Sequence, residues 1–298
     1  MLLFDTHADT LFRLCFPDGE GEEMDVTKEM LLQGGVTVQT MAMFVGRSDL
    51  KSIRIAFDRM LQKKEELTAA GFRQVDELRE AKEGDTAFML SVEGCDLLDG
   101  HGEMLYDWRK QGVRMAALTW NYENCVATPA CKDASSGLKP FGREAVREMQ
   151  RLKMAVDVSH LNEGGFYELL EMGVVPLASH SCCRKLCDHT RNLTDDQLRA
   201  LFSAGGYVGV NFYPAFLRRD EKADIRDVCD HVIHMLEMGG EGKIGFGSDF
   251  DGIEMKPAGL SGPQDFPALL NALRRRGLDE KTITGIAGEN LLHYYDRI

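Results

Sequence analysis

Short apolar runs alternate with longer amphipathic stretches along the chain. Most of these runs are apolar on both faces, which is typical of strands buried on both sides of a parallel sheet. The predicted strands are Leu2–His7, Val36–Val45, Ala87–Glu93, Arg114–Trp120, Ala155–His160, Val175–His180, Tyr207–Tyr213 and Ile244–Phe250. The amphipathic stretches predict helices at Ser52–Ala70, Phe141–Lys153, Glu163–Met172, Thr194–Ser203, Ile225–Met238 and Pro267–Arg276.

Eight predicted strands that alternate with predicted helices indicate an α/β fold. A closed (β/α)8 TIM barrel fits a chain of 298 residues better than an open doubly wound sheet. Two local signals support the helix boundaries: Thr194 and Gln197 form a capping-box pattern, and Gly173 follows a helix as a stop signal. The chain has no Pro- or Ser-rich linker and no repeat, so we expect one domain over residues 1–298.

Charge and cysteine content narrow the possible partners and location. The formal net charge is −13, and an acidic surface repels phosphate backbones, so we expect no nucleic-acid partner. The start MLLFDTHADT has neither the basic residues nor the apolar run of a signal peptide, and no stretch has the length of a membrane span. Eight cysteines without a CxxC pair indicate reduced thiols. We therefore expect a cytoplasmic protein with no membrane contact.

Histidine, aspartate and glutamate residues, which are uncommon in buried strands, lie at the carboxyl ends of the predicted strands. In a barrel these ends and the loops after them form the active-site face. Six side chains that can bind a metal or transfer a proton are therefore expected to meet on one rim: His7, Asp9, Glu93, His160, His180 and Asp249.

Each of these residues has an ordinary interpretation when taken alone. Glu93 is compatible with a salt bridge in a loop, and a single histidine after a strand is more often a core residue or a helix cap. His7 and Asp9 are two apart, so an extended backbone points both to one side, and an imidazole with a carboxylate suits Zn²⁺. Together with His160 and His180, the set favours shared metal ligation. Asp249 is expected at a strand end, with Asp251 capping the loop.

The remaining histidines and cysteines predict no second metal site. His231 and His234 lie one helical turn apart without the Glu of an HExxH motif, which indicates helix packing or solvent exposure. His189 lies near the segment that forms the site. The adjacent Cys182 and Cys183 point different ways and lack a zinc-knuckle spacing.

The motifs FDTHADT, SVEG, DVSH, ASHS, TRNLTDDQL, GVNFY and GFGSDFDG occur here in the order and spacing of the membrane (renal) dipeptidase family. The resemblance runs from Phe4 to the GENLL segment near residue 290. Any one motif is weak, but the ordered set is specific. The resemblance implies a (β/α)8 barrel that carries a binuclear zinc centre and hydrolyses dipeptides.

Roles for individual residues follow from the resemblance. It implies that His7 and Asp9 bind one zinc ion and that His160 and His180 bind the other. Glu93 resembles the carboxylate that, with a water or hydroxide, bridges the two ions.

Three further residues resemble catalytic or substrate-binding residues of the family. Asp249 resembles the catalytic aspartate, Arg191 the arginine that pairs with the substrate carboxylate, and Tyr213 a residue lining the substrate pocket. Animal members have LTH where this chain has LTWN, so Trp120 replaces a histidine and oxyanion support falls to zinc or to neighbours such as Asn121. The resemblance further implies tolerance of a D-residue at the second position and a homodimer.

Two other functions are compatible with the metal-binding rim. One is another metal-dependent amidohydrolase that acts on N-acyl amino acids, lactones or aminopurines, because a fold does not fix a function. The other is a non-catalytic metal-binding protein on the same scaffold. The TRN segment with Arg191 and the order of the motifs favour dipeptides.

Overall fold

Eight parallel strands close into a barrel in the computed structural model, which describes residues 1–17 and 23–298. They follow one another around the barrel, and a pairing between β2 and β4 closes the ring. The barrel strands are β1 (Phe4–Ala8), β2 (Val38–Phe44), β4 (Ala87–Glu93), β5 (Val113–Ala117), β6 (Ala155–Asp157), β7 (Leu177–Ser181), β8 (Tyr207–Val210) and β9 (Ile244–Phe246). The predicted (β/α)8 architecture is confirmed.

All eight predicted strands are present, but several end earlier than predicted. The sequence predicted that one strand would extend to His160, whereas β6 ends at Asp157 because the backbone of His160 adopts a φ of 69°. This left-handed conformation cannot continue a strand. The short strand β3 (Arg73–Gln74) pairs with β4 outside the ring and was not predicted, because two residues carry no periodicity.

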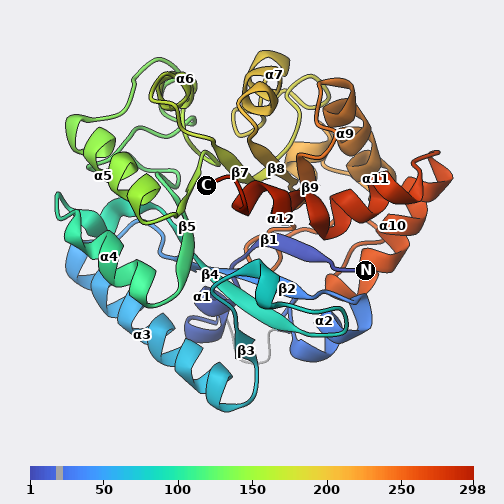
Figure 1. Ribbon diagram of the computed structural model, residues 1–298, viewed down its shortest axis with the longest axis horizontal. Helices are drawn as coiled ribbons and strands as arrows, with labels where there is room; N and C mark the ends of the chain where they lie inside the picture. The colour runs from blue at the N-terminus through green and yellow to red at the C-terminus, as the bar shows by residue number, and fades with distance from the viewer. Residues whose placement is uncertain (18–22) are drawn as a thin grey trace.

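Helices surround the barrel (Figure 1). The six predicted helices are present as α3 (Leu50–Ala69), α5 (Pro140–Arg151), α6 (Glu163–Glu171), α7 (Asp195–Ser203), α9 (Ile225–Glu237) and α10 (Phe266–Arg275). The sequence analysis did not predict α1 (Thr10–Cys15), α2 (Lys28–Gly34), α4 (Glu103–Lys110), α8 (Pro214–Leu217), α11 (Glu280–Thr284) and α12 (Asn290–Tyr295). The capping box of Thr194 and Gln197 is confirmed, with both hydrogen bonds formed.

The carboxyl-terminal segment covers the amino-terminal end of the barrel (Figure 1). Asn290 donates its side-chain amide to the carbonyl of Ile244 on β9, and the Tyr294 hydroxyl donates to the carbonyl of Val175 just before β7. Because one barrel end is covered in this way, the opposite end, where the strands terminate, is left for a site.

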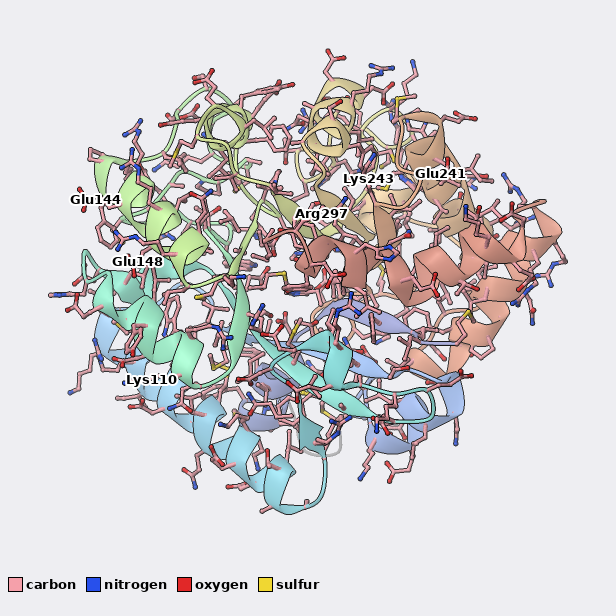
Figure 2. The ribbon with its side chains drawn as sticks, in the orientation of Figure 1. Lys110, Glu144, Glu148, Glu241, Lys243 and Arg297 are labelled. Carbon is pink, nitrogen blue, oxygen red and sulfur yellow. The ribbon has the colours of Figure 1, made fainter. Side chains whose placement is uncertain are left out.

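Charged side chains cover the outer faces of the helices, including Lys110 of α4 and Glu144 of α5 (Figure 2). Apolar side chains such as Leu105 of α4 and Val146 of α5 turn inward and are fully buried. Along the described ranges 1–17 and 23–298, no helix combines the length and the hydropathy that crossing a bilayer requires.

Candidate metal centre

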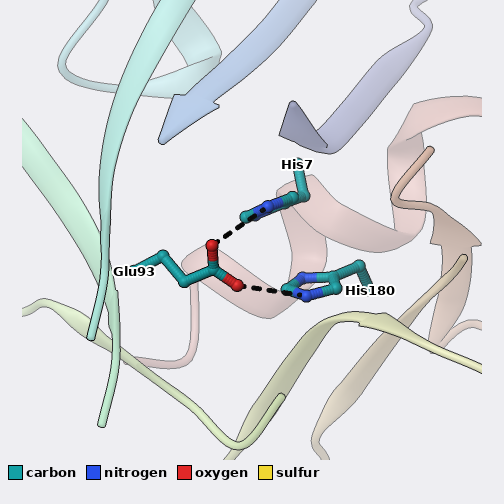
Figure 3. A group of neighbouring side chains, drawn as sticks. All are labelled: His7, Glu93 and His180. Atoms are coloured by element: carbon teal, nitrogen blue, oxygen red, sulfur yellow. Dashed lines mark ion pairs between the residues drawn. The ribbon is translucent and has the colours of Figure 1, made fainter. Parts of the chain in front are cut away.

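Side chains from five strand ends meet at the carboxyl-terminal mouth of the barrel. Figure 3 shows Glu93, at the end of β4, between His7 of β1 and His180 of β7. His7 Nε2 lies 3.8 Å from Glu93 Oε2, and His180 Nε2 lies 3.4 Å from Glu93 Oε1. All three residues are buried. The strand ends thus bring together side chains that are up to 173 positions apart in the sequence.

His160 completes the group around Glu93. Its Nε2 lies 2.8 Å from Glu93 Oε1 and 3.2 Å from His180 Nε2. The three atoms form a compact triangle of two imidazole nitrogens and one carboxylate oxygen, the donor types that Zn²⁺ takes in proteins.

A second group of ligand atoms lies on the other side of Glu93. His7 Nε2 is 3.7 Å from Asp9 Oδ1 and 3.6 Å from Asp249 Oδ1. His7 Nε2 and Asp9 Oδ1 are buried and have no hydrogen-bond partner. Buried polar atoms are normally satisfied, so two unsatisfied atoms that face one another indicate a place for a cation.

Hydrogen bonds at the far side of two rings leave their Nε2 atoms without a proton. Asn121 Oδ1 lies 2.9 Å from His160 Nδ1, and an amide oxygen can only accept, so Nδ1 carries the ring proton. Ser179 Oγ donates to Asp157 Oδ2 at 2.5 Å, so its lone pair accepts the proton of His180 Nδ1 at 2.7 Å. Both Nε2 lone pairs therefore point at the carboxylate of Glu93.

The protonation states make this cluster fit a metal ion. Burial holds the pKa of His160 and His180 well below the usual value, so both rings are neutral at pH 7. Burial, followed by the nearby Asp9 and Asp249 carboxylates, raises the pKa of Glu93 well above its ordinary value. Lone pairs and carboxylates that crowd a buried space repel one another, and divalent cations remove that repulsion. The residues present fit two such ions.

Two of the site residues have left-handed backbones. His160 has φ 69° and Asp249 has φ 67°, which is rare for residues other than glycine and concentrates at functional sites. The backbone packs closely just before Asp249: a Cβ on Gly247 would lie 1.8 Å from the carbonyl oxygen of Ser179. The turn after β9 thus places the Asp249 side chain against the cluster.

Asn211 orients Asp249 and the segment after β8. Its Nδ2 donates to Asp249 Oδ2 at 2.9 Å, and its Oδ1 accepts from the backbone N–H of Tyr213 at 2.5 Å. Burial raises the pKa of Asp249 to about 6. With Oδ2 held by Asn211, Oδ1 is the atom that faces the cluster.

Arg191 is a buried cation without a carboxylate partner among the residues that the structure describes. It is 6% exposed, its Nη2 donates to the carbonyl of His180 at 3.4 Å, and its Nε has no partner. The ring of Phe216 lies 5.4 Å from the guanidinium carbon, and His189 Nδ1 accepts from the Arg191 backbone N–H. A guanidinium held this way beside the cluster can receive an anion from outside the chain.

Trp120 forms an aromatic wall at the end of β5. Its ring centroid lies 4.9 Å from that of Phe44, 5.4 Å from that of Tyr122 and 6.3 Å from that of His160. Asn121 was predicted to bind substrate, and the contact that the structure shows for its side chain is the one with His160. Tyr213 packs edge-on against Phe216 at 5.0 Å, and so lies near Arg191.

His231 and His234 make structural contacts away from the cluster. His231 is buried, accepts from the Cys183 backbone N–H through Nδ1 and donates to the carbonyl of Leu217 through Nε2. His234 pairs with Asp195. Asp251 accepts from Thr10 and from a backbone N–H, as a loop cap does. Within the described parts of the chain, no cysteine joins a group of metal-ligating side chains.

Sequence reasoning missed the residues that orient the ligands. Asp157 and Ser179 support His180, Asn211 holds Asp249, and the buried Asp5 accepts from the backbone N–H and hydroxyl of Ser248 on the neighbouring strand end. All of them stand inside motifs quoted above. A buried carboxylate, amide or hydroxyl within three residues of a candidate site residue was the available signal.

Replacing Asp157 by asparagine is expected to weaken metal binding about 10- to 100-fold, the usual effect of losing an outer hydrogen-bond partner of a ligand. The new amide donates to Ser179 Oγ, so the hydroxyl proton turns to His180 Nδ1 and the ring proton moves to Nε2. Zinc titration against a competing chelator measures the change. Asp133→Asn, at a half-buried aspartate with similar serine contacts, is the control, and equal affinities in both variants would contradict the relay.

The closed parallel barrel, with histidines and carboxylates gathered at its carboxyl end, defines the class: a (β/α)8 barrel protein built around a metal-type site. The sequence model of the membrane dipeptidase family (peptidase family M19) matches residues 1–297 of this chain. The chain belongs to this family.

Relatives and solved structures agree with that assignment. An uncharacterised dipeptidase of Schizosaccharomyces pombe is 39% identical over 212 residues, which are 70% of this chain and 52% of that protein. Dipeptidase tcpJ of Claviceps purpurea is 33% identical over 221 residues, 73% of this chain and 52% of that protein. The chain thus spans about half the length of these two relatives.

The crystal structure of a metallopeptidase from Rhodobacter sphaeroides, liganded with a phosphinate mimic of the dipeptide L-Ala-D-Ala, is similar throughout. It has a TM-score of 0.92 and 25% identity, covering 100% of this chain and 99% of that chain.

Proposed function

We propose that this protein is a zinc-dependent dipeptidase that hydrolyses the peptide bond of dipeptides. The observation that carries the proposal is the cluster of ligand side chains around Glu93, with His7 on one side and His160 and His180 on the other. Beside it lies a buried arginine, Arg191, that forms no ion pair with a carboxylate among the described residues. The first feature suits a hydrolytic metal centre, and the second suits a substrate whose carboxylate lies close to the scissile bond.

The ligand groups divide between two ions. His160 and His180 would hold one, His7 and Asp9 the other, and Glu93 would bridge them with one oxygen toward each group. When bound, the two zinc ions lower the pKa of a bridging water and polarise the scissile carbonyl. The protein's own contribution is to fix the tautomers of His160 and His180 and to hold the carboxylates of Asp9, Glu93 and Asp249 close to the place of the cations.

Asp249 is the proposed proton carrier. Its Oδ1 faces the cluster while Asn211 fixes Oδ2, so one oxygen is oriented and the other is free to take a proton. The carboxylate accepts a proton from the attacking water and gives it to the leaving amine. Because the same atom serves both transfers, the side chain needs no rearrangement between them.

Arg191 is the proposed anchor of the substrate's terminal carboxylate, and Tyr213 lines the same region. A guanidinium offers two parallel N–H donors that match a carboxylate. Burial lowers the pKa of Arg191, whereas Glu93 and Asp249 favour its charged form. An arginine so close to the cluster favours substrates that end one residue beyond the scissile bond.

Trp120 stands where animal family members have a histidine. Its indole N–H can donate a hydrogen bond but the ring cannot accept a proton, so Trp120 would offer an oxyanion one hydrogen bond at most. We further propose that the enzyme tolerates a D-residue at the second position, which the phosphinate mimic of L-Ala-D-Ala bound to the Rhodobacter sphaeroides relative supports.

Metal removal and a substrate panel test the proposal. Chelated protein is expected to lose at least 99% of its activity on L,L and L,D dipeptides and to recover it with about two equivalents of zinc. Tripeptides and N-acyl amino acids, lactones and aminopurines are expected to be poor substrates. Activity on one of the non-peptide classes without dipeptide hydrolysis would contradict the dipeptidase assignment, and activity that survives complete metal removal would contradict the metal centre.

A further inference from the structure

A cavity of about 570 Å³ opens beside the candidate metal centre. Its lining comes from the loops after β2, β4 and β5, and it includes Trp120 and Asn121, the residues next to His160. Val45 and Ile53 supply an apolar part, Arg47 and Lys132 supply cations, and Asp96 and Glu123 supply carboxylates. None of the metal ligands or the proton carrier lines it, so its chemistry is not accounted for by the reaction.

The position of the cavity relates it to one end of the substrate. Arg191 follows β7, which lies across the barrel from β2 (Figure 1). With the terminal carboxylate at Arg191 and the scissile carbonyl at the cluster, the amino-terminal residue extends toward the loops after β2 and β5. Its side chain is therefore the group that reaches the cavity.

The charge of the cavity is unusual for this chain. Arg47 is exposed, and its guanidinium carbon lies 5.2 Å from the ring centre of Tyr122, with no carboxylate in ion-pair range among the described residues. Lys132 pairs with Glu123, which also accepts Lys139 at 3.0 Å, so two lysines neutralise one acid. A protein of net charge −13 thus keeps an unpaired cation at the mouth of this cavity.

The cavity on the other side of Phe44 has the opposite character. It has a volume of about 390 Å³ and is lined by Asp9, Asp25 and Glu254 among other residues, with Lys256 paired to Asp25 at 2.6 Å. Acidic side chains outnumber basic ones in this second cavity, which suits the substrate ammonium, whereas the unpaired Arg47 of the first cavity suits an anion. The two cavities therefore suit different parts of the substrate.

We propose that the 570 Å³ cavity receives the side chain of the amino-terminal residue and that Arg47, supported on the ring of Tyr122, selects an acidic side chain there. The preferred substrates are then dipeptides that begin with glutamate or aspartate. This inference rests on the proposed dipeptidase function.

The test compares L-Glu-L-Ala with its neutral isostere L-Gln-L-Ala. Wild-type enzyme is expected to show a kcat/KM about 10-fold higher for the glutamate substrate, mainly through KM, because a charge-assisted hydrogen bond forms with Arg47. Arg47→Gln is expected to remove that preference and leave turnover of L-Ala-L-Ala unchanged. Arg47→Glu is expected to shift the preference to L-Lys-L-Ala.

Arg54→Gln is the matched control, since it removes the same charge from the exposed face of α3 without lining the cavity. Its preference for L-Glu-L-Ala is expected to stay within twofold of wild type. Hydrolysis of L-Ala-L-Ala with equal rates for the glutamate and glutamine substrates, or a preference that survives Arg47→Gln, would overturn the inference alone. Failure of wild-type enzyme to cleave any dipeptide would instead overturn the proposed function.

Discussion

Glu93→Gln is expected to reduce dipeptide hydrolysis by at least roughly 1000-fold and to abolish binding of the zinc pair. Loss of an outer hydrogen-bond partner already costs about 10- to 100-fold, and the carboxylate of Glu93 lies against both ligand groups. The amide cannot supply a negative charge to either group. It also places an N–H₂ group against Nε2 atoms that carry lone pairs, so the two groups lose their common ligand.

Metal content and thermal stability measure this effect independently of turnover. Saturating zinc is expected to raise the Tm of the wild-type protein by about 10 °C, because a ligand at ~1000 times its Kd stabilises by about 4 kcal/mol. Glu93→Gln is expected to lose that increment while its metal-free form stays folded, since the change removes one of several buried, mutually repelling carboxylates. Asp96→Asn, three residues further along, is the control. A variant that kept two zinc ions would contradict a bridging Glu93.

The fold was predictable because barrel strands are buried on both faces and read as continuous apolar runs. Ala87–Glu93 was predicted with the bounds that β4 has in the structure. The errors came from short elements. α1 has six residues directly after the first ligand motif, and α12 is recognisable only from its packing on the barrel end through Asn290 and Tyr294. Neither segment carries enough periodicity to separate it from a loop.

The candidate site was predictable as far as the order of the strands determines which side chains lie close together. Polar side chains at the carboxyl ends of neighbouring parallel strands lie close together, so the sequence predicted that His7, Glu93 and His180 would share one site. Which partner fixes each ring was not predictable. Asn121 and His160 are 39 positions apart, and their hydrogen bond depends on the loop after β5, whose path no local pattern specifies.

The supporting hydrogen bonds explain why each sequence motif contains more residues than the metal-ligating side chain alone. In DVSH and ASHS, Asp157 and Ser179 set the tautomer of His180, and Asp157 also accepts the backbone N–H groups of Ser159 and Ser179. The same contacts therefore tie β6 to β7 and orient a ligand. The same residues therefore stabilise the barrel and orient a ligand, so the motif alone does not show which of the two roles a given residue has.

Asp249→Asn is expected to lower kcat about 1000-fold while both zinc ions remain bound, since general acid–base catalysis contributes about 10²–10⁴-fold. The orientation of the new amide is determined by its neighbour. Asn211 presents N–H to this position and cannot flip, because its oxygen accepts from the Tyr213 backbone. The amide oxygen must therefore face Asn211, and the N–H₂ group, which cannot take a proton, faces the cluster.

The pH profile separates this role from a structural one. Burial raises the pKa of Asp249 to about 6 in the metal-free chain, and adjacent cations lower it, so wild-type kcat/KM is expected to fall as the pH drops below about 6, where the carboxylate becomes protonated. Asp249→Asn is expected to lack this acid limb. Asp251→Asn is the matched control, because Asp251 caps the loop through Thr10 and should lose less than about tenfold. A variant at Asp249 that retained both turnover and the acid limb would show that another group carries the proton.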